Sequence, residues 1–431
     1  MHYSVKLQTM NKLFIGTVFA AAVLSACSKN DNANPNPAPG KDTTSVSGQV
    51  SGTWTKGNIY NVTGSLEIPQ GKTLTIEEGV TVLFTDTIVK PEVIVKGNLY
   101  SMGTAANPVK FTVPDAMKTT ANLFGGLWGG IIAGPASTEL ALVYTTLEYG
   151  GAVTTEESAS VKAGLYKAAA GEHVPAVYYG NVNGKVVIMN SSVHNFYEDG
   201  FYMEGGQLVI ANNTVYTTGI ANGDVVNIKS GCVADVSFNT IYSPNTNGLK
   251  LSNSGDRTPQ AFVVGYNNTI LNAGWRRPTT KGGSIWVEKG VRVTLYNNLL
   301  ANDRYGIKRD KGNPEDSANG RSQFGNTLYY GYTQTGVDQF QPSNEIIAGA
   351  NDVIGTKAGD NDPKFVNYPV STDNINATFN TGWDFHVQSG SPALGKGKTS
   401  FTRNFSAGLV VNGITYTSPA PADYIGAYGT K

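Results

Sequence analysis

The chain has 431 residues, including 51 glycines, and 15% of its residues are charged. Its 32 basic residues balance its 32 acidic ones, which argues against nucleic acid or an anionic membrane surface as the partner. Abundant glycine and sparse charge favour a turn-rich all-β chain, long enough for one large domain or two ordinary ones.

The first 26 residues have the pattern of a secretory signal. Lys6 and Lys12 precede an apolar run from Leu13 to Leu24, which is too short to span a bilayer. The tetrapeptide Leu24-Ser25-Ala26-Cys27 resembles the lipobox of bacterial lipoproteins, in which the cysteine is acylated and becomes the first residue. The resemblance implies a signal peptide over residues 1–26, lipidation at Cys27, and membrane contact through the lipid anchor alone.

Residues 27–47 follow this signal and include the run NANPNPAPGKDTTS. A segment rich in asparagine and proline buries little apolar surface, so we expect a tether. Lys29 and Asp31, a basic residue followed by an acidic one, resemble the surface-export signal of some outer-membrane lipoproteins. That resemblance implies an outer-membrane protein exposed at the cell surface. Besides Cys27 the chain has only Cys232, so no disulfide framework is possible, and we expect Cys232 to be a small core residue.

From Ser191 onward the sequence repeats with a drifting period. The same corner position is occupied, at spacings of 22, 26, 29 and 30 residues, by Ser191, Asn213, Asn239, Asn268 and Asn298. A period of this size indicates a solenoid. Each repeat has three short apolar or β-branched runs and no segment of helical period, which describes a parallel β-helix with three short strands per coil. Asparagine suits the corner because it tolerates left-handed backbone and because stacked amides can hydrogen-bond between coils.

Several segments carry a family resemblance. Gly52 to Val82 resembles an amino-terminal coil, LWGGIIAG (Leu127 to Gly134) an early rung, and DFHVQSGSPALGKG (Asp384 to Gly397) with Tyr424 to Tyr428 a carboxy-terminal segment of bacterial β-helix lipoproteins. The chain therefore resembles the pectate-lyase-like superfamily. This implies a single-stranded, right-handed parallel β-helix over residues 48–431, with an alanine-rich insertion near 152–175 and less regular coils from about 311.

The same resemblance implies candidate lyase residues. GWRRPTTKGG places Arg276 where such lyases have a catalytic base and Lys281 where they have a second arginine. Asn190 to Gly206 resembles the coil that supplies calcium ligands, and Asp199 fits one of them. However, Met203 stands where the second acid belongs, Glu204 is displaced by one residue, and Asn190 replaces a further acid. Calcium is thus the only cofactor implied, with Asp199 and Glu204 as a weak site.

Alternation along the third run of each coil predicts which side chains face outward. The expected inward residues are Phe201, Met203, Val226, Ile228, Leu249, Leu251, Ile285 and Val287. The outward residues then form a column that we expect to bind the ligand: Tyr202, Asn227, Lys229, Lys250, Trp286 and Lys308. Glu204 and Glu288 lie three coils apart, which at about 14 Å is too far to share a calcium ion or to form a glycosidase pair.

This column would be a ribbon about 20 Å long, a length that suits several units of an extended chain. We expect an exposed Trp286 to stack on sugar, with Asn227 and Tyr202 supplying hydrogen bonds. The three lysines favour an anionic or sulfated glycan. The alternative is that the column is a solvated face of the solenoid with one stray tryptophan.

Three functions remain open on the sequence. The first, which we favour, is binding of extracellular polysaccharide without turnover by a monomeric surface protein. The second is a metal-assisted polysaccharide lyase that uses Arg276, for which the carboxylate set is incomplete. The third is a structural or adhesive solenoid with a protein partner. The preference for the first depends largely on analogy with the fold.

Overall fold

The structure of this protein is a computed structural model that describes residues 41–277, 279, 282–340, 345, 348–371 and 376–431. Cys27 and Lys281 lie outside these ranges. Lys41–Lys431 forms one compact unit, and most of its regular structure consists of strands. No helix in the described part of the chain is long and apolar enough to cross a membrane.

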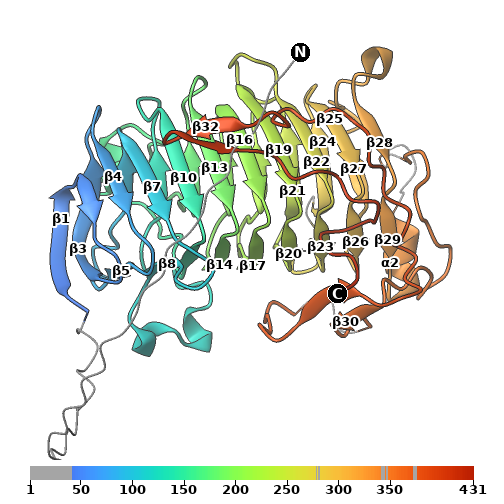
Figure 1. Cartoon of the computed structure of the whole chain (residues 1–431), viewed down its shortest axis with the longest axis horizontal. Helices are drawn as coiled ribbons and strands as arrows, with labels where there is room; N and C mark the ends of the chain where they lie inside the picture. Colours follow the sequence, from blue (N-terminus) through green and yellow to red (C-terminus); the bar gives the residue numbers. More distant parts are fainter. Residues whose placement is uncertain (1–40, 278, 280–281, 341–344, 346–347, 372–375) are drawn as a thin grey trace, which may run out of the picture. The chain divides into compact units, whose positions relative to one another are not determined.

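The strands wind into three faces, of which the first is a 10-stranded sheet and the second and third together form a 19-stranded sheet, and within each face neighbouring strands are parallel (Figure 1). β1 (Thr43–Gln49) and β3 (Ile59–Ile68) pair along their length at the start of the second and third faces. The first face contains β2 (Gly52–Trp54), β4 (Thr73–Ile76), β7 (Asn98–Met102), β10 (Glu139–Val143), β13 (Lys185–Met189), β16 (Gly206–Ala211), β19 (Cys232–Ser237), β22 (Phe262–Tyr266), β25 (Arg292–Tyr296) and β28 (Gln323–Gly325). The second continues with β5 (Thr81–Phe84), β8 (Val109–Thr112), β11 (Thr145–Glu148), β14 (Ser192–Phe196), β17 (Thr214–Thr218), β20 (Thr240–Tyr242), β23 (Thr269–Leu271), β26 (Leu299–Ala301) and β29 (Leu328–Tyr330). The third continues with β6 (Val93–Val95), β9 (Ile131–Ala133), β12 (Val177–Tyr179), β15 (Phe201–Met203), β18 (Val226–Ile228), β21 (Asn247–Ser252), β24 (Gly283–Glu288) and β27 (Ile307–Arg309).

The pairing pattern defines the coils. Each strand from β4 to β24 pairs with the strand three places later in the chain, so each turn adds one strand to every face. On the third face Val226 pairs with Leu249 and Leu249 with Ile285, and all three are buried. The predictions of an all-β parallel β-helix and of the strand register on this face are confirmed.

One continuous apolar core fills the interior of the coils. It extends from Trp54 on the first coil to Phe340 near the last and contains the inward residues of all three faces. Cys232 is among them and is fully buried, as expected for a small core residue. Because each inward side chain stacks on its equivalents one coil away, the core fixes how neighbouring coils align.

The carboxy-terminal segment covers the outer sides of two faces. The antiparallel pair β30 (Phe365–Asn367) and β31 (Asp384–Val387) belongs to an apolar cluster with outward residues of the second face, such as Tyr242 and Leu271. The hairpin of β32 (Leu409–Val411) and β33 (Ile414–Tyr416) packs on the first face against Val187 and Val209. The third face is therefore the one whose outer side this segment leaves available for other contacts.

The corner between the first and second faces contains a ladder of side-chain amides. Backbone and side-chain N–H groups of Asn213 donate to Oδ1 of Asn239, those of Asn239 to Asn268, and those of Asn268 to Asn298, at 2.9–3.1 Å. The expected coil-to-coil amide stacking is confirmed. The left-handed backbone belongs instead to the residue before each ladder residue, for example Asn212 and Phe238.

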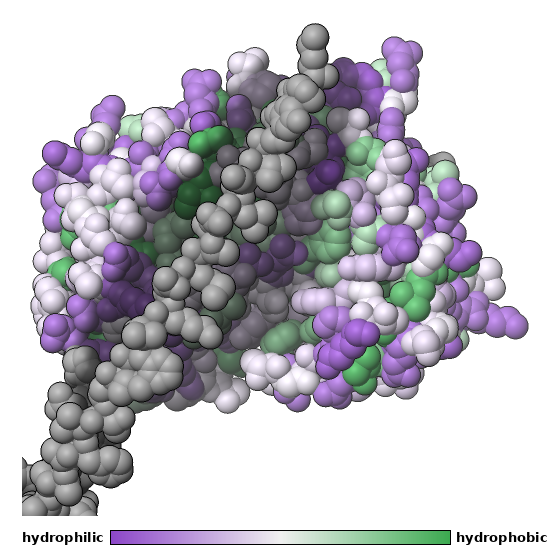
Figure 2. Space-filling model, in the orientation of Figure 1, coloured by the Kyte–Doolittle hydropathy of each residue, from purple (hydrophilic) through white to green (hydrophobic). Residues whose placement is uncertain are grey.

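Several short elements differ from a plain coil. β1 begins at Thr43, so the first strand lies partly within the segment assigned to the tether, because the Thr- and Val-containing run TTSVSGQ can extend a parallel sheet. Residues 152–175 contain one short helix, and the described part of residues 311–382 contains the three short strands β28, β29 and β30. The helical elements are η1 (Asp115–Met117), η2 (Thr120–Asn122), α1 (Ala159–Lys162), η3 (Ala318–Gly320) and α2 (Gln334–Gln339). In space-filling view the visible surface is mainly hydrophilic or neutral, with smaller hydrophobic patches (Figure 2).

Candidate functional site

The third face presents a column of outward side chains across consecutive coils. Pairing runs from Tyr202 to Asn227, then to Lys250, to Trp286 and to Lys308. This is the order in which strand alternation places these five residues, and Lys229, the sixth predicted residue, follows directly after β18. Its first neighbour toward the amino terminus is Tyr178 on β12.

The column forms the floor of a pocket of about 390 Å³. Five of the six predicted ligand-binding residues line it, and the exception is Lys308. Loops between the second and third faces supply the walls: the insertion provides Tyr166 and Lys167, two shorter loops provide acidic and amide groups, and the loop before β24 provides Arg277. A concave site with aromatic rings and a few convergent polar groups is typical of small-ligand binding.

Trp286 faces outward as predicted but is not exposed. Only 4% of its surface is accessible, its Nε1 donates to Glu288 Oε2 at 3.0 Å, and the Lys308 ammonium lies 5.5 Å from its ring centroid. The expectation of an open stacking platform is therefore wrong. Neighbouring side chains cover the ring, and what remains accessible contributes an apolar part of the pocket lining.

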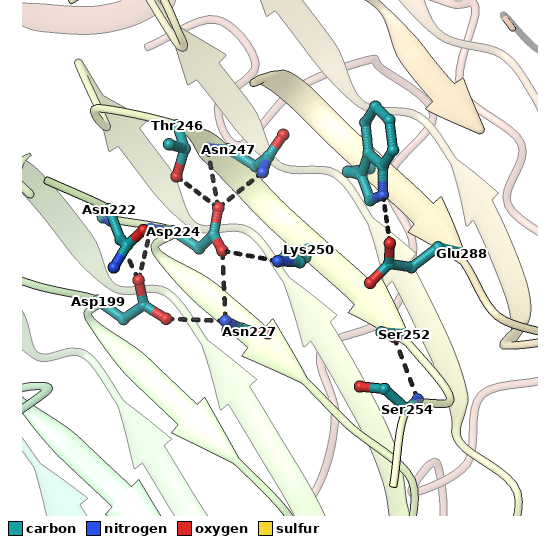
Figure 3. A network of polar contacts seen from close by, with 12 residues as sticks. Asp199, Asn222, Asp224, Asn227, Thr246, Asn247, Lys250, Ser252, Ser254 and Glu288 are labelled. Atoms are coloured by element: carbon teal, nitrogen blue, oxygen red, sulfur yellow. Dashed lines mark hydrogen bonds and ion pairs between the residues drawn. The ribbon is translucent and has the colours of Figure 1, made fainter. Parts of the chain in front are cut away.

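Two aspartates and one asparagine form the polar centre of the pocket (Figure 3). The Asn227 amide donates to Asp199 Oδ2 at 2.8 Å and, less closely, to Asp224 Oδ2 at 3.3 Å. The other oxygen of Asp199 accepts from the backbone N–H groups of Gly223 and Asp224. Because both carboxylates only accept, the amide nitrogen of Asn227 must face them, which leaves its Oδ1 without a partner among the described residues.

Asp224 was missed by the sequence analysis although a signal was present. It stands two residues before the first inward residue of β18, at the same position as Asp199 before β15 and Asn247 before Leu249. Asp224 Oδ1 accepts from the Thr246 hydroxyl at 2.6 Å and from the Asn247 amide at 2.7 Å. An acid or amide at one fixed offset in three successive coils would have identified this row.

Burial changes the acidity of the pocket carboxyls. Desolvation, reinforced by the charge of Asp199, raises the pKa of Glu198 to about 8. Desolvation, reinforced by Asp224, raises the pKa of Asp199 to about 6. Strongly perturbed carboxyls in a cleft are candidates for functional groups. Glu198 is thus mostly protonated at neutral pH and can donate as well as accept a hydrogen bond.

The lysines of the column are balanced by acids. The Asp224 carboxylate, 3.8 Å from the ammonium, raises the pKa of Lys250, whereas burial and then the charge of Lys250 lower the pKa of Lys229. Four basic and four acidic side chains line the pocket: Lys167, Lys229, Lys250, Arg277, Glu198, Asp199, Asp224 and Glu288. The expectation of a locally basic ribbon is therefore wrong, because Glu198, Asp199 and Asp224 from two loops and Glu288 from the end of β24 add negative charge beside the column.

Arg276 does not line the pocket. Its guanidinium donates to the carbonyls of Gly219 at 2.7 Å, Thr218 at 2.6 Å and Ser243 at 2.8 Å, and it lies 5.0 Å from the Phe124 ring centroid. Burial lowers the pKa of Arg276 to about 10, which still leaves it protonated near neutrality. A protonated guanidinium has no lone pair with which to take a proton. The structure gives Arg276 the role of an anchor, neither a base facing the pocket nor a freely solvated turn residue.

Arg277, the next residue, is the one that reaches the pocket. Its Nη1 donates to Asn222 Oδ1 at 3.3 Å, and Asn222 in turn donates to Glu198 Oε1 at 2.8 Å. These contacts join three loops into one wall. The hydrogen bonds of the partly buried Arg276 guanidinium hold the backbone from which Arg277 extends.

The structure gives the two predicted metal ligands separate partners. Asp199 lies in the network around Asn227, whereas Glu204 forms an ion pair with Arg257 at 2.7 Å and accepts from the Tyr178 hydroxyl at 2.9 Å. Among the residues that the structure describes, no group of three or more His, Cys, Asp or Glu side chains could hold a metal ion. Met203 points into the core.

The insertion at residues 152–175 forms a fixed wall. Glu92, which is 3% exposed, accepts from the backbone N–H of Ser160 at 2.6 Å and from its hydroxyl at 2.7 Å. Leu165 packs in an apolar cluster with Ile94 and Ile132. The Tyr166 ring meets the rings of Tyr178 and Tyr202 edge-on, with centroids 5.5 and 5.3 Å apart.

Comparison with known protein families agrees with this architecture. The family model described as a pectate-lyase-like beta helix domain matches residues 46–376. The chain belongs to this family, which supports a polysaccharide-related or solenoid protein. Searches of the curated proteins and of the solved structures find no match.

Proposed function

We propose that this protein is a lipid-anchored surface β-helix that binds extracellular saccharide in the pocket of the third face. One observation carries the proposal: the predicted column and the loops between the second and third faces converge on a single pocket that combines aromatic rings with hydrogen-bonding groups. Rings fit the apolar face of a sugar, and carboxylates, amides and ammonium groups pair with its hydroxyls.

The charges that line the pocket determine whether a neutral or an anionic saccharide fits it. With four acids matching four bases, the lining suits a polar ligand whose hydroxyls both donate and accept. Protonation of Glu198 near neutrality leaves a small positive excess, so an anionic sugar is also accommodated. Neutral and anionic saccharides are therefore both included in the proposal, whereas the lysines alone favoured an anionic or sulfated glycan over a neutral one.

The location of the protein is part of the same proposal. The lipobox-like tetrapeptide ending at Cys27 supports lipidation and attachment to the outer membrane, with the domain facing outward. We expect Cys27→Ala to release the protein from the membrane fraction or to stall its processing. A variant that fractionates with membranes as the wild type does would contradict this assignment.

A glycan array tests the binding function. Detergent-solubilised full-length protein should bind a limited set of saccharides, and Arg277→Ala should weaken that binding. Arg292→Ala is a matched control, because Arg292 lies on the first face above the Phe262 ring and away from the pocket. Absence of binding across the array, or equal binding by both variants, would contradict the proposal.

A second function is favoured by one observation, the raised pKa of Glu198. A carboxylic acid that stays protonated near neutral pH and lines a saccharide pocket can act as a general acid in glycoside hydrolysis. Hydrolysis would release new reducing ends from a bound glycan, and Glu198→Gln would abolish the release. Elimination, the lyase chemistry, would instead produce ultraviolet absorbance, which the anchored position of Arg276 does not support.

A further inference from the structure

The floor of the pocket is short. Its residues Tyr202, Asn227, Lys250 and Trp286 occupy four consecutive coils. Three strand spacings separate the first from the last, which amounts to about 14 Å. The column itself continues past both ends of this floor, to Tyr178 on one side and to Lys308 on the other.

The insertion closes the amino-terminal end. Tyr166 makes edge-on contacts with both Tyr178 and Tyr202, at the point where the column would continue toward β12. The same segment is held by the two hydrogen bonds from Ser160 to the buried Glu92. These contacts are internal to the fold, so the closure is part of the folded domain.

The opposite end is closed by Lys308. Its ammonium lies 3.8 Å from the Tyr305 ring centroid and 5.5 Å from that of Trp286, and it forms an ion pair with Glu345 at 3.0 Å. The Lys308 side chain retains only 12% exposure. A ligand lying along the column would meet this group directly beyond Trp286.

We infer that the pocket takes the terminal unit or units of a saccharide chain and does not accept an internal stretch. The inference rests on the proposed function and names the part of the glycan that is recognised. An internal stretch that lies along the column would have to enter and leave at its two ends, and both ends are occupied by packed side chains. A chain end needs only one exit, which the open side of the pocket provides.

Binding stoichiometry on polymers of different length tests this inference. Suitable probes are size-fractionated dextran, polygalacturonate and hyaluronan, which cover neutral and anionic chains. End recognition predicts that the amount of protein bound per chain stays constant as the chains lengthen. Protein bound in proportion to chain length would overturn the inference while leaving saccharide binding in place, whereas no binding to any probe would count against the proposed function itself.

A pair of substitutions at Tyr166 adds an independent readout. Tyr166 has a left-handed backbone with φ of 55°, which glycine adopts readily, so Tyr166→Gly removes the ring without straining the loop. This variant should gain binding that rises with chain length. Tyr166→Phe keeps the ring and should retain the constant ratio. If both variants keep a constant ratio, Tyr166 does not close the pocket and the inference fails.

Discussion

The two corners that flank the second face follow opposite rules. At the corner from the first to the second face, two residues separate the strands in coil after coil: 190–191, 212–213, 238–239, 267–268 and 297–298. At the corner from the second to the third face, the connections are 149–176, 197–200, 219–225, 243–246 and 272–282. The constant corner contains the amide ladder, and the variable corner contains every loop that builds the pocket walls.

The constant corner helps to fix the fold, whereas the variable corner forms the walls of the site. In the constant corner each buried amide accepts from the coil before it, so an inserted residue would break two neighbouring coils. In the variable corner the strands on either side are already aligned by the core, so the loops can differ in length and chemistry. The solenoid thus holds loops from different coils side by side over one floor.

The core beneath both corners should respond most strongly to substitution. Leu251 is fully buried on the inward side of β21, between residues of the adjacent coils. Truncation to alanine should lower the free energy of unfolding by about 2–5 kcal/mol. Equilibrium denaturation measures the loss, and a change no larger than that of a surface substitution would contradict the strand register.

A substitution in the amide ladder of the constant corner should lower stability by less than a substitution in the core. Asn268→Ala removes the oxygen that accepts from the backbone and side-chain N–H groups of Asn239. Leaving such buried donors unpaired should cost about 1–3 kcal/mol of stability. Asn183, which is exposed in a turn, is the control, and Asn183→Ala should change stability little. Equal effects at the two sites would show that the ladder does not stabilise the coils.

At the variable corner, a substitution of Arg276 should weaken ligand binding. Arg276→Lys removes the planar fork that contacts three carbonyls and should displace the backbone that positions Arg277. Loss of one charged hydrogen bond to the ligand would reduce affinity about tenfold. Titration with a glycan identified on the array measures this change. Unchanged affinity would mean that the Arg276 anchor is not needed for the site.

The buried Glu198 in the pocket should make the free energy of unfolding depend on pH. A carboxyl whose pKa is raised to about 8 on folding, from 4.5, favours the folded state below pH 4.5, and this contribution is lost as pH rises through 8. Relative to Glu198→Gln, the wild type should therefore lose stability between about pH 5 and 8. Parallel pH dependence of the two proteins in chemical denaturation would contradict the burial of an ionisable Glu198.

The sequence predicted the floor of the site better than its walls, for a physical reason. The order of Tyr202, Asn227, Lys250 and Trp286 follows from side-chain alternation, which is a local rule. The burial of Trp286 depends on Lys308 and Glu288 packing around its ring, and the closure by Tyr166 depends on an insertion anchored to Glu92, two coils before β12. No periodicity encodes those contacts.

The segment that resembles a lyase loop was also misinterpreted because its contacts with other coils cannot be read from local sequence. GWRRPTTKGG resembles a catalytic loop in sequence, yet the direction of its first arginine is decided by carbonyls of residues 218, 219 and 243. Those residues lie in other coils, and their carbonyl directions depend on the loops around them. Asp224, by contrast, could have been found, because its offset before β18 repeats that of Asp199 before β15.

The most direct test of saccharide binding on the third face is an affinity comparison between Lys250→Met and Lys185→Met. Lys250 lies at the centre of the pocket floor, and Lys185 lies on β13 of the first face. Methionine keeps the apolar stem of lysine and removes its charge, so the fold should persist in both variants. Calorimetric titration with the array-identified glycan should show affinity at least about tenfold lower for Lys250→Met and unchanged for Lys185→Met. Wild-type affinity in Lys250→Met would contradict the assignment of the site to this pocket.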